Sequence, residues 1–125
     1  MSETLRQVRG RRAQLLGVAA EDVACRALEQ DGWTIHCRRL RTEVAEIDLI
    51  AEKDGLLAIV EVKARPRLAD AAGALTPRQQ ARLLAAAEIV LAAHPEWGAH
   101  AVRFDVLVVD QAGAVRRIID AFRAE

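Results

Sequence analysis

Two charged pairs interrupt apolar segments near the middle of the chain, and their types suit metal-assisted chemistry. Glu46 and Asp48 alternate with apolar residues in the segment 44–51, and Glu61 and Lys63 do so in the segment 56–64. A half-buried carboxylate is costly unless it is paired or bound to a metal. Two converging carboxylates repel each other, and a divalent cation such as Mg²⁺ relieves that repulsion. A nearby ammonium group could position a water molecule or stabilise charge that develops at phosphorus.

Lysine at position 63 stands out against the composition of the chain. Of the 18 basic residues, 16 are arginine, and Lys53 and Lys63 are the two lysines. Lys53 lies in the polar turn 52–55 and needs no special explanation. Burial can tune the pKa of a lysine, whereas a guanidinium stays charged. We therefore interpret Lys63 as a residue whose chemistry an arginine could not supply.

The hydrophobic pattern predicts the element order α-β-β-β-α-β-β. Apolar residues recur at helical spacing over 13–31, and Thr76-Pro77 begins a second helix with Gln79 three residues after the Thr76 N-cap. An Asp-Gly dipeptide between two apolar runs predicts a hairpin. We expect an α/β fold with a mixed central sheet flanked by helices. The predicted strands are 33–40, 44–51, 56–64, 102–109 and 115–119, the segment 67–75 is a loop, and the second helix ends near residue 93.

The predicted hairpin can bring the charged pairs together. Strict alternation would place Ile47 and Leu49 on one face of their strand and Asp48 on the other. Symmetry about residues 53–55 places Asp48 opposite residue 60, one step from Glu61. Ordinary cross-strand ion pairs that involve Lys63 explain the same charges about as well.

Glu21 is an acid on the core-facing stripe of the first helix. It could be a third acid over a metal site, or it could pair with Arg38 or Arg39. On the strand 102–109, Arg103 and Asp105 share a face and are expected to form a structural ion pair.

Length and composition limit the classes of function. The chain has 125 residues, 52% of them apolar, and a formal net charge of zero. We expect a basic tail over 1–12 and a single domain over 13–125. Neutrality argues against a protein that coats DNA generally, and no apolar run is long enough for a membrane span. Two cysteines without a disulfide framework, and no secretory signal, predict a cytoplasmic protein. The histidines share no ligand spacing with the cysteines, which argues against a zinc site.

An ordered set of motifs resembles the YraN family, small bacterial proteins that are similar to Holliday-junction resolvases and to restriction endonucleases of the PD-(D/E)xK type. The resemblance runs from Arg11 to Phe122. Its motifs are Gly17-x-x-Ala20-Glu21-x-x-Ala24, Ala45-Glu46-Ile47-Asp48-Leu49-Ile50, Ile59-Val60-Glu61-Val62-Lys63, Gln80, Arg103-Phe104-Asp105-Val106 and Asp120-Ala121-Phe122.

The resemblance implies a restriction-endonuclease-like core and a catalytic site. It implies that Asp48 and Glu61 bind Mg²⁺, with Mn²⁺ as a substitute and Glu21 as a further acid, and that the Val62 carbonyl assists. Lys63 would position or activate the attacking water, and Gln80 would face the site. The implied reaction is hydrolysis of phosphodiester bonds in DNA, with branched DNA as a candidate substrate and a homodimer as a candidate assembly. Candidate nucleic-acid contacts are Arg38, Arg39, Arg78 and Arg82.

The chain departs from the usual YraN pattern at four places. Ala45 stands where members usually carry Gly, Arg39 where they carry Asn, and Gln79 where they carry Lys. The loop before Thr76 also lacks the Phe-Gly pair that is common there. None of these changes removes a presumed metal ligand, but they affect the expected substrate contacts. A DNA-binding protein of this fold that does not cut is therefore the alternative function, and a subunit that acts only with a partner is a third.

Overall fold

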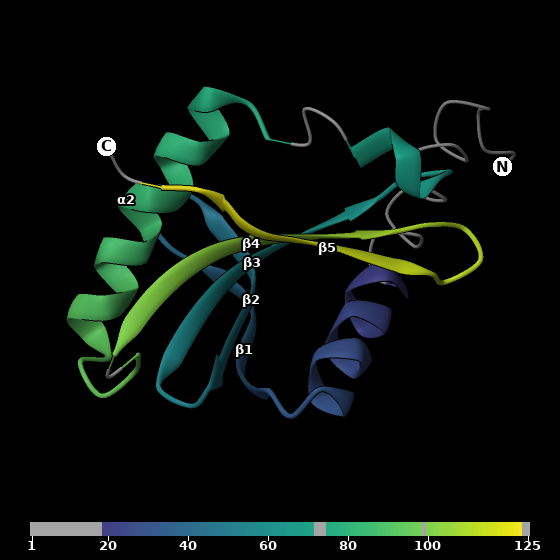
Figure 1. The fold of residues 1–125 in the computed structure, drawn as a ribbon. Helices are drawn as coiled ribbons and strands as arrows, with labels where there is room; N and C mark the ends of the chain where they lie inside the picture. Colours follow the sequence, from purple (N-terminus) through teal and green to yellow (C-terminus); the bar gives the residue numbers. More distant parts are fainter. Residues whose placement is uncertain (1–18, 72–74, 99, 124–125) are drawn as a thin grey trace, which may run out of the picture.

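The computed structural model describes residues 19–71, 75–98 and 100–123 (Figure 1). Residues 19–30 are helical and are called the N-terminal helix below. The predicted tail 1–12 and residues 13–18 of the predicted helix lie outside the described part of the chain. The other elements are β1 (Thr34–Arg41), β2 (Glu46–Lys53), β3 (Leu56–Ala64), the 3-10 helix η1 (Leu68–Ala71), α2 (Pro77–Ala93), β4 (Ala101–Val109) and β5 (Val115–Phe122).

The five strands form one mixed sheet in the order β1-β2-β3-β4-β5. Neighbouring strands are antiparallel except β3 and β4, which are parallel and are joined through α2. Parallel neighbours need such a crossover, because the chain must return to the other end of the sheet before the second strand can run in the same direction. The predicted α/β class and element order are confirmed, with η1 as an addition inside the predicted loop 67–75.

Helices cover both faces of the sheet (Figure 1). On one face the N-terminal helix contributes Ala20, Ala24, Cys25 and Leu28 to a core with residues of β2, β3 and β4. On the other face α2 contributes Leu83, Ala86, Ala87 and Val90 to a second core. Burial of both faces explains why the central strands are apolar on both sides. Neither helix, over its described residues, is long and apolar enough to cross a membrane.

α2 begins where the sequence predicts. The Thr76 side chain accepts a hydrogen bond from the Gln79 backbone N–H, and the Gln79 side chain accepts one from the Thr76 backbone N–H. This reciprocal capping box, followed by Pro77 at the first helical position, satisfies backbone donors that a helix start leaves open.

The β2–β3 hairpin sets the register on which the candidate site depends. Asp54 and Gly55 have φ angles of 52° and 79°, as a two-residue turn of type I′ requires. The ladder then runs from Lys53 opposite Leu56 to Leu49 opposite Val60. One further step along this register places Asp48 opposite Glu61. Rough symmetry about residues 53–55 predicted a position near residue 60 and left the register open; the turn is centred between Asp54 and Gly55, which moves the partner of Asp48 one residue further.

The sheet bends at Asp48. Ile47 packs in the core under α2, whereas Leu49 packs in the core under the N-terminal helix. The prediction that these two residues share a face was therefore wrong. In β1, Arg39 lies between the partners of Leu49 and Ile47 and has a φ of 51°. The left-handed backbone of Arg39 interrupts the regular pleat beside Asp48. The alternation of side chains between the two faces of the sheet is therefore broken at this point.

Candidate active site

The Asp48 carboxylate lies where β2 and β3 stop pairing through their backbones. The described ladder ends at Leu49 and Val60. Beyond that point the Val62 backbone N–H donates a hydrogen bond to Asp48 Oδ2 at 2.8 Å. The side chain thus replaces a backbone carbonyl as the acceptor, which fixes the carboxylate between the separating strands.

Glu61 and Lys63 lie on one face of β3, beside the Asp48 side chain of β2. Lys63 Nζ is 3.4 Å from Glu61 Oε1, and the two side chains are only 18% and 17% exposed. The structure therefore brings together three of the predicted site residues, Asp48, Glu61 and Lys63. A half-buried ammonium thus lies next to two carboxyl groups at this point of the sheet.

Both carboxyl groups are reluctant to ionise. Burial, followed by the neighbouring Asp48 carboxylate, raises the pKa of Glu61 to about 7. Burial also raises the pKa of Asp48, with a smaller contribution from Glu21, and this outweighs the hydrogen bond from the Val62 N–H. Raised pKa values at two adjacent carboxyl groups are typical of sites that hold a cation or move a proton.

Glu21 forms the ion pair with Arg39 that the sequence offered as one alternative, and it also lies near Asp48. Its carboxylate lies near enough to Asp48 to raise that residue's pKa. Its Oε2 also accepts a hydrogen bond from Arg39 Nε at 2.7 Å. Next to it, Asp22 pairs with Arg38 at 2.5 Å. Two ion pairs thus fasten the N-terminal helix to β1, and Arg39 holds the Glu21 carboxylate.

The remaining predicted residues lie on α2. Gln80 Nε2 donates a hydrogen bond to the Leu75 carbonyl at 3.2 Å. A cavity of about 210 Å³ opens beside Glu61. It is lined by Arg82 and by Gln79, the residue that precedes Gln80. Gln79 was predicted as a capping residue and as a departure from the YraN pattern that affects substrate contacts, and it borders the cavity beside Glu61. Arg78 is exposed one helical turn before Arg82.

Most of the described chain matches a known protein family. The model described as "Uncharacterised protein family UPF0102" matches residues 20–109. This chain belongs to the UPF0102 family. A UPF0102 protein of Granulibacter bethesdensis is 63% identical over 118 residues, which cover 94% of this chain and 75% of that protein. A UPF0102 relative from Rhodopseudomonas palustris is 47% identical over 108 residues, covering 86% and 83% of the two chains. One from Azorhizobium caulinodans is 45% identical over 113 residues, covering 90% and 86%.

UPF0102 is the YraN family, so the membership predicted from the motifs is confirmed. The names of these UPF0102 relatives state no activity. The function of this UPF0102 chain therefore has to be argued from the chemistry of its own residues.

The donor set of this UPF0102 site suits Mg²⁺, which keeps several bound waters, better than it suits a metal ion whose ligands all come from the protein. Within residues 19–71, 75–98 and 100–123, no three His, Cys, Asp or Glu side chains form a group that could hold a metal ion. Asp48 and Glu61 supply two carboxylates, and Mg²⁺ commonly binds through one or two carboxylates while keeping waters and taking substrate phosphate oxygens. Glu21 holds Arg39 through Oε2 and has a second carboxylate oxygen.

Replacing Glu61 with Gln is expected to stabilise the metal-free protein at alkaline pH. The pKa of Glu61 is raised above its usual value, so the native state holds its proton more tightly than the unfolded state does. The resulting stability is present in acid and is lost as pH rises through about 7. We expect Glu61→Gln to raise the free energy of unfolding by about 1–3 kcal/mol near pH 8, and by little near pH 5.

Urea unfolding in a chelator at the two pH values measures this difference. Glu88→Gln, which changes an exposed acid of α2 in the same way, should leave the free energy within about 0.5 kcal/mol of wild type. A Glu61→Gln protein less stable than wild type near pH 8 would show that the Glu61 charge is well compensated in the native state.

Proposed function

We propose that this protein is a metal-dependent nuclease that hydrolyses phosphodiester bonds in DNA. The observation that supports this most is the meeting of Asp48, Glu61 and Lys63 at the point where β2 and β3 separate. Burial raises the pKa of both carboxyl groups, and the Asp48 carboxylate raises that of Glu61 further, so keeping both groups here costs stability when they ionise. Such groups are commonly found together where they serve a reaction.

A divalent cation would be held by Asp48 and Glu61, with Mg²⁺ as the expected ion and Mn²⁺ as a substitute. Oxygen ligands and open coordination positions suit both ions and suit a phosphate substrate. When bound there, the cation would polarise a phosphoryl oxygen and favour deprotonation of water.

The protein's own groups would orient the reactants around that ion. The Val62 N–H holds Asp48 in one orientation, and Lys63 holds Glu61. The Lys63 ammonium is half-buried, so it can donate a hydrogen bond to a water or to a non-bridging phosphate oxygen with little competition from solvent. Glu21, kept in place by Arg39, adds negative potential that favours a cation over a bare phosphate in the metal position.

Cleavage assays on a panel of DNA substrates test this proposal. The panel comprises a four-way junction, a flap, a duplex and a single strand, each with Mg²⁺, with Mn²⁺ and with a chelator. We expect at least one substrate to be cut with either ion and none with the chelator. Asp48→Asn keeps the size of the side chain and should abolish both cleavage and Mn²⁺ binding, whereas Glu88→Gln should affect neither.

Cleavage that persists in the chelator or in Asp48→Asn would disprove the assignment. Salt-sensitive DNA binding that is unchanged by Asp48→Asn, with no cleavage of any substrate, would instead support a DNA-binding protein of this fold that does not cut.

A further inference from the structure

Most arginines of the described chain have a hydrogen-bond or ion-pair partner. Carboxylates pair with Arg38, Arg39, Arg41, Arg103, Arg117 and Arg123, and Arg65 donates a hydrogen bond to the Ala64 carbonyl. Within the same described residues, four arginines have neither a hydrogen bond nor an ion pair, and all four are exposed: Arg26, Arg78, Arg82 and Arg116. A paired guanidinium must give up its partner before it can bind a ligand, whereas an unpaired one is available at once.

Arg78 and Arg82 lie on one face of α2, because residues four apart are neighbours on a helix surface. Arg82 lines the cavity that also contains Glu61, so this face borders the candidate active site. Both arginines lie in the first two turns of the helix, which begins at Pro77. No acidic residue occupies the first turn of α2 to neutralise them.

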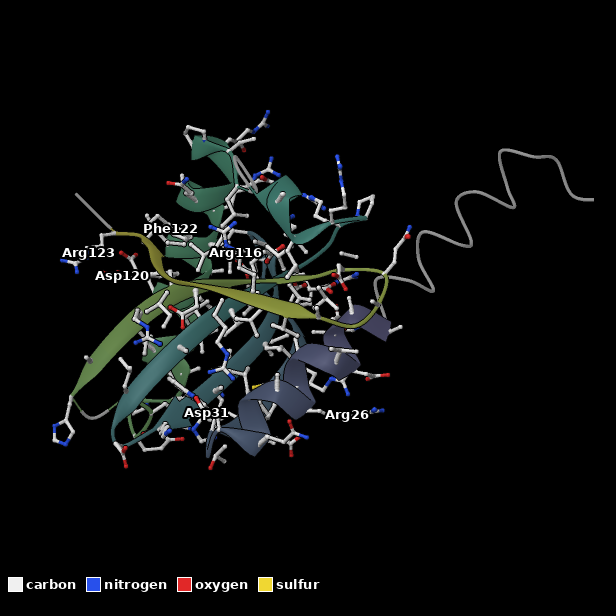
Figure 2. All side chains as sticks on the ribbon, turned by 45° about the vertical axis from the view of Figure 1, so that its right-hand side comes forward. Arg26, Asp31, Arg116, Asp120, Phe122 and Arg123 are labelled. Carbon is white, nitrogen blue, oxygen red and sulfur yellow. The ribbon has the colours of Figure 1, made fainter. Side chains whose placement is uncertain are left out.

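Arg116 reaches the same side of the molecule from β5. Lys63 pairs with Val108 in β4, and Val108 pairs with Arg116 in β5. Paired residues on neighbouring strands share a face, so Arg116 lies on the face of Lys63, about 10 Å away across two strand spacings. Val108 belongs to a core with Leu75, next to the start of α2, which identifies this face as the α2 side. Figure 2 shows Arg116 beside β5 on the side of α2, and Arg26 on the N-terminal helix on the opposite side of the sheet.

We propose that Arg78, Arg82 and Arg116 bind the phosphate backbone of the DNA substrate. The DNA then contacts the protein at the start of α2 and at β5, and Lys63 and Glu61 lie between these two contacts. This inference rests on the proposed function and names the surface through which the substrate is held. It also assigns a different task to Arg38 and Arg39, which fasten the N-terminal helix and position Glu21.

The charge of the protein agrees with a contact confined to a few residues. The net charge is zero, so a general attraction to DNA is absent. Affinity must then come from individual guanidinium groups that release counterions from phosphates. Arginine suits this task, since its planar fork can donate two parallel hydrogen bonds to one phosphate.

Binding of the full-length chain to a fluorescent four-way DNA junction, measured in a chelator so that no cutting occurs, tests the proposal. We expect Arg116→Gln to weaken binding about three- to tenfold and to reduce the slope of log affinity against log salt by about 0.9, the value for one lost phosphate contact. Arg78→Gln with Arg82→Gln should reduce the slope by about twice that amount. Arg26→Gln removes an unpaired arginine from the opposite face and should change neither quantity.

Equal binding by Arg116→Gln and wild type would overturn the proposal, as would an equal loss in Arg26→Gln. Absence of any junction binding by the wild-type chain would also overturn it. These outcomes are separate from failure of the nuclease proposal, because binding in a chelator does not require a cation or a cleavage step. A protein that binds through these arginines and never cuts would keep this inference and refute the nuclease.

Discussion

If the protein is the nuclease proposed above, replacing Lys63 with Met lowers the rate of DNA cleavage by about 10²–10⁴-fold, the range found when one group that stabilises charge or transfers a proton is removed. The Lys63 ammonium is 3.4 Å from Glu61 and mostly shielded from solvent, so water cannot easily replace it. Met keeps the length of the side chain and packs against the same neighbours. We therefore expect the circular dichroism spectrum and the cooperative unfolding transition to be retained.

Two further variants separate a chemical role of Lys63 from a structural one. Lys53→Met removes the other lysine at the far end of the same hairpin, where its ammonium bonds the Asp31 carbonyl at 2.5 Å, and it should cut DNA at the wild-type rate. Lys63→Arg preserves an ion pair with Glu61 but replaces a compact ammonium with a planar, permanently charged group. A purely structural ion pair predicts full activity for Lys63→Arg, whereas our proposal predicts at least a tenfold loss. Wild-type cleavage by Lys63→Met would remove Lys63 from the mechanism.

Elements that are specified by local sequence were predicted closely. The second helix has the predicted start because Thr76, Pro77 and Gln79 are enough to build its capping box without help from the rest of the fold. β3 spans the predicted residues because the Asp-Gly turn begins it and Pro66 follows its end. Such signals act over a few residues, so the sequence alone suffices to locate them.

The geometry around Asp48 could not be predicted because it depends on contacts between strands. Its register follows from the type of turn, and its orientation follows from a left-handed residue on another strand, Arg39. The resemblance marked position 39 as a departure from the expected YraN pattern, with Arg in place of Asn. Only the structure shows that the backbone at this position is left-handed, a conformation that Asn adopts more readily than arginine.

The candidate site also contains some residues that the sequence alone could group and others whose place depends on the packing of the helices. The types and spacing of Asp48, Glu61 and Lys63 indicated that a hairpin could bring them together, and the resemblance grouped them as a site. The partners of Glu21 and the residues of α2 that border the site depend on how the two helices lie on the sheet. A helical residue turns about 100° from its neighbour. The resemblance implied that Gln80 faces the site, whereas the cavity beside Glu61 is lined by the preceding residue, Gln79.

The second large effect is expected at Asp105, the one buried charged residue in the described chain. Its carboxylate accepts two hydrogen bonds of 2.8 Å from Arg103, which confirms the predicted ion pair, and a third of 3.0 Å from the Asp120 backbone N–H. The β4–β5 ladder is irregular next to this point, and Asp120 has a φ of 55°. Asp105 therefore satisfies a backbone donor that the irregular ladder leaves without a strand partner.

Asp105→Ala should lower the free energy of unfolding by about 3–5 kcal/mol, because it leaves the Arg103 charge and the Asp120 N–H without their acceptor. Urea unfolding measures the loss, and Asp22→Ala, which breaks an exposed Asp–Arg pair, should cost under about 1 kcal/mol. Adding Arg103→Leu to Asp105→Ala should restore part of the loss, since the double variant no longer holds an uncompensated guanidinium. Strictly additive losses would mean that the backbone contact with Asp120, and not the ion pair, is what Asp105 contributes to the junction of β4 and β5.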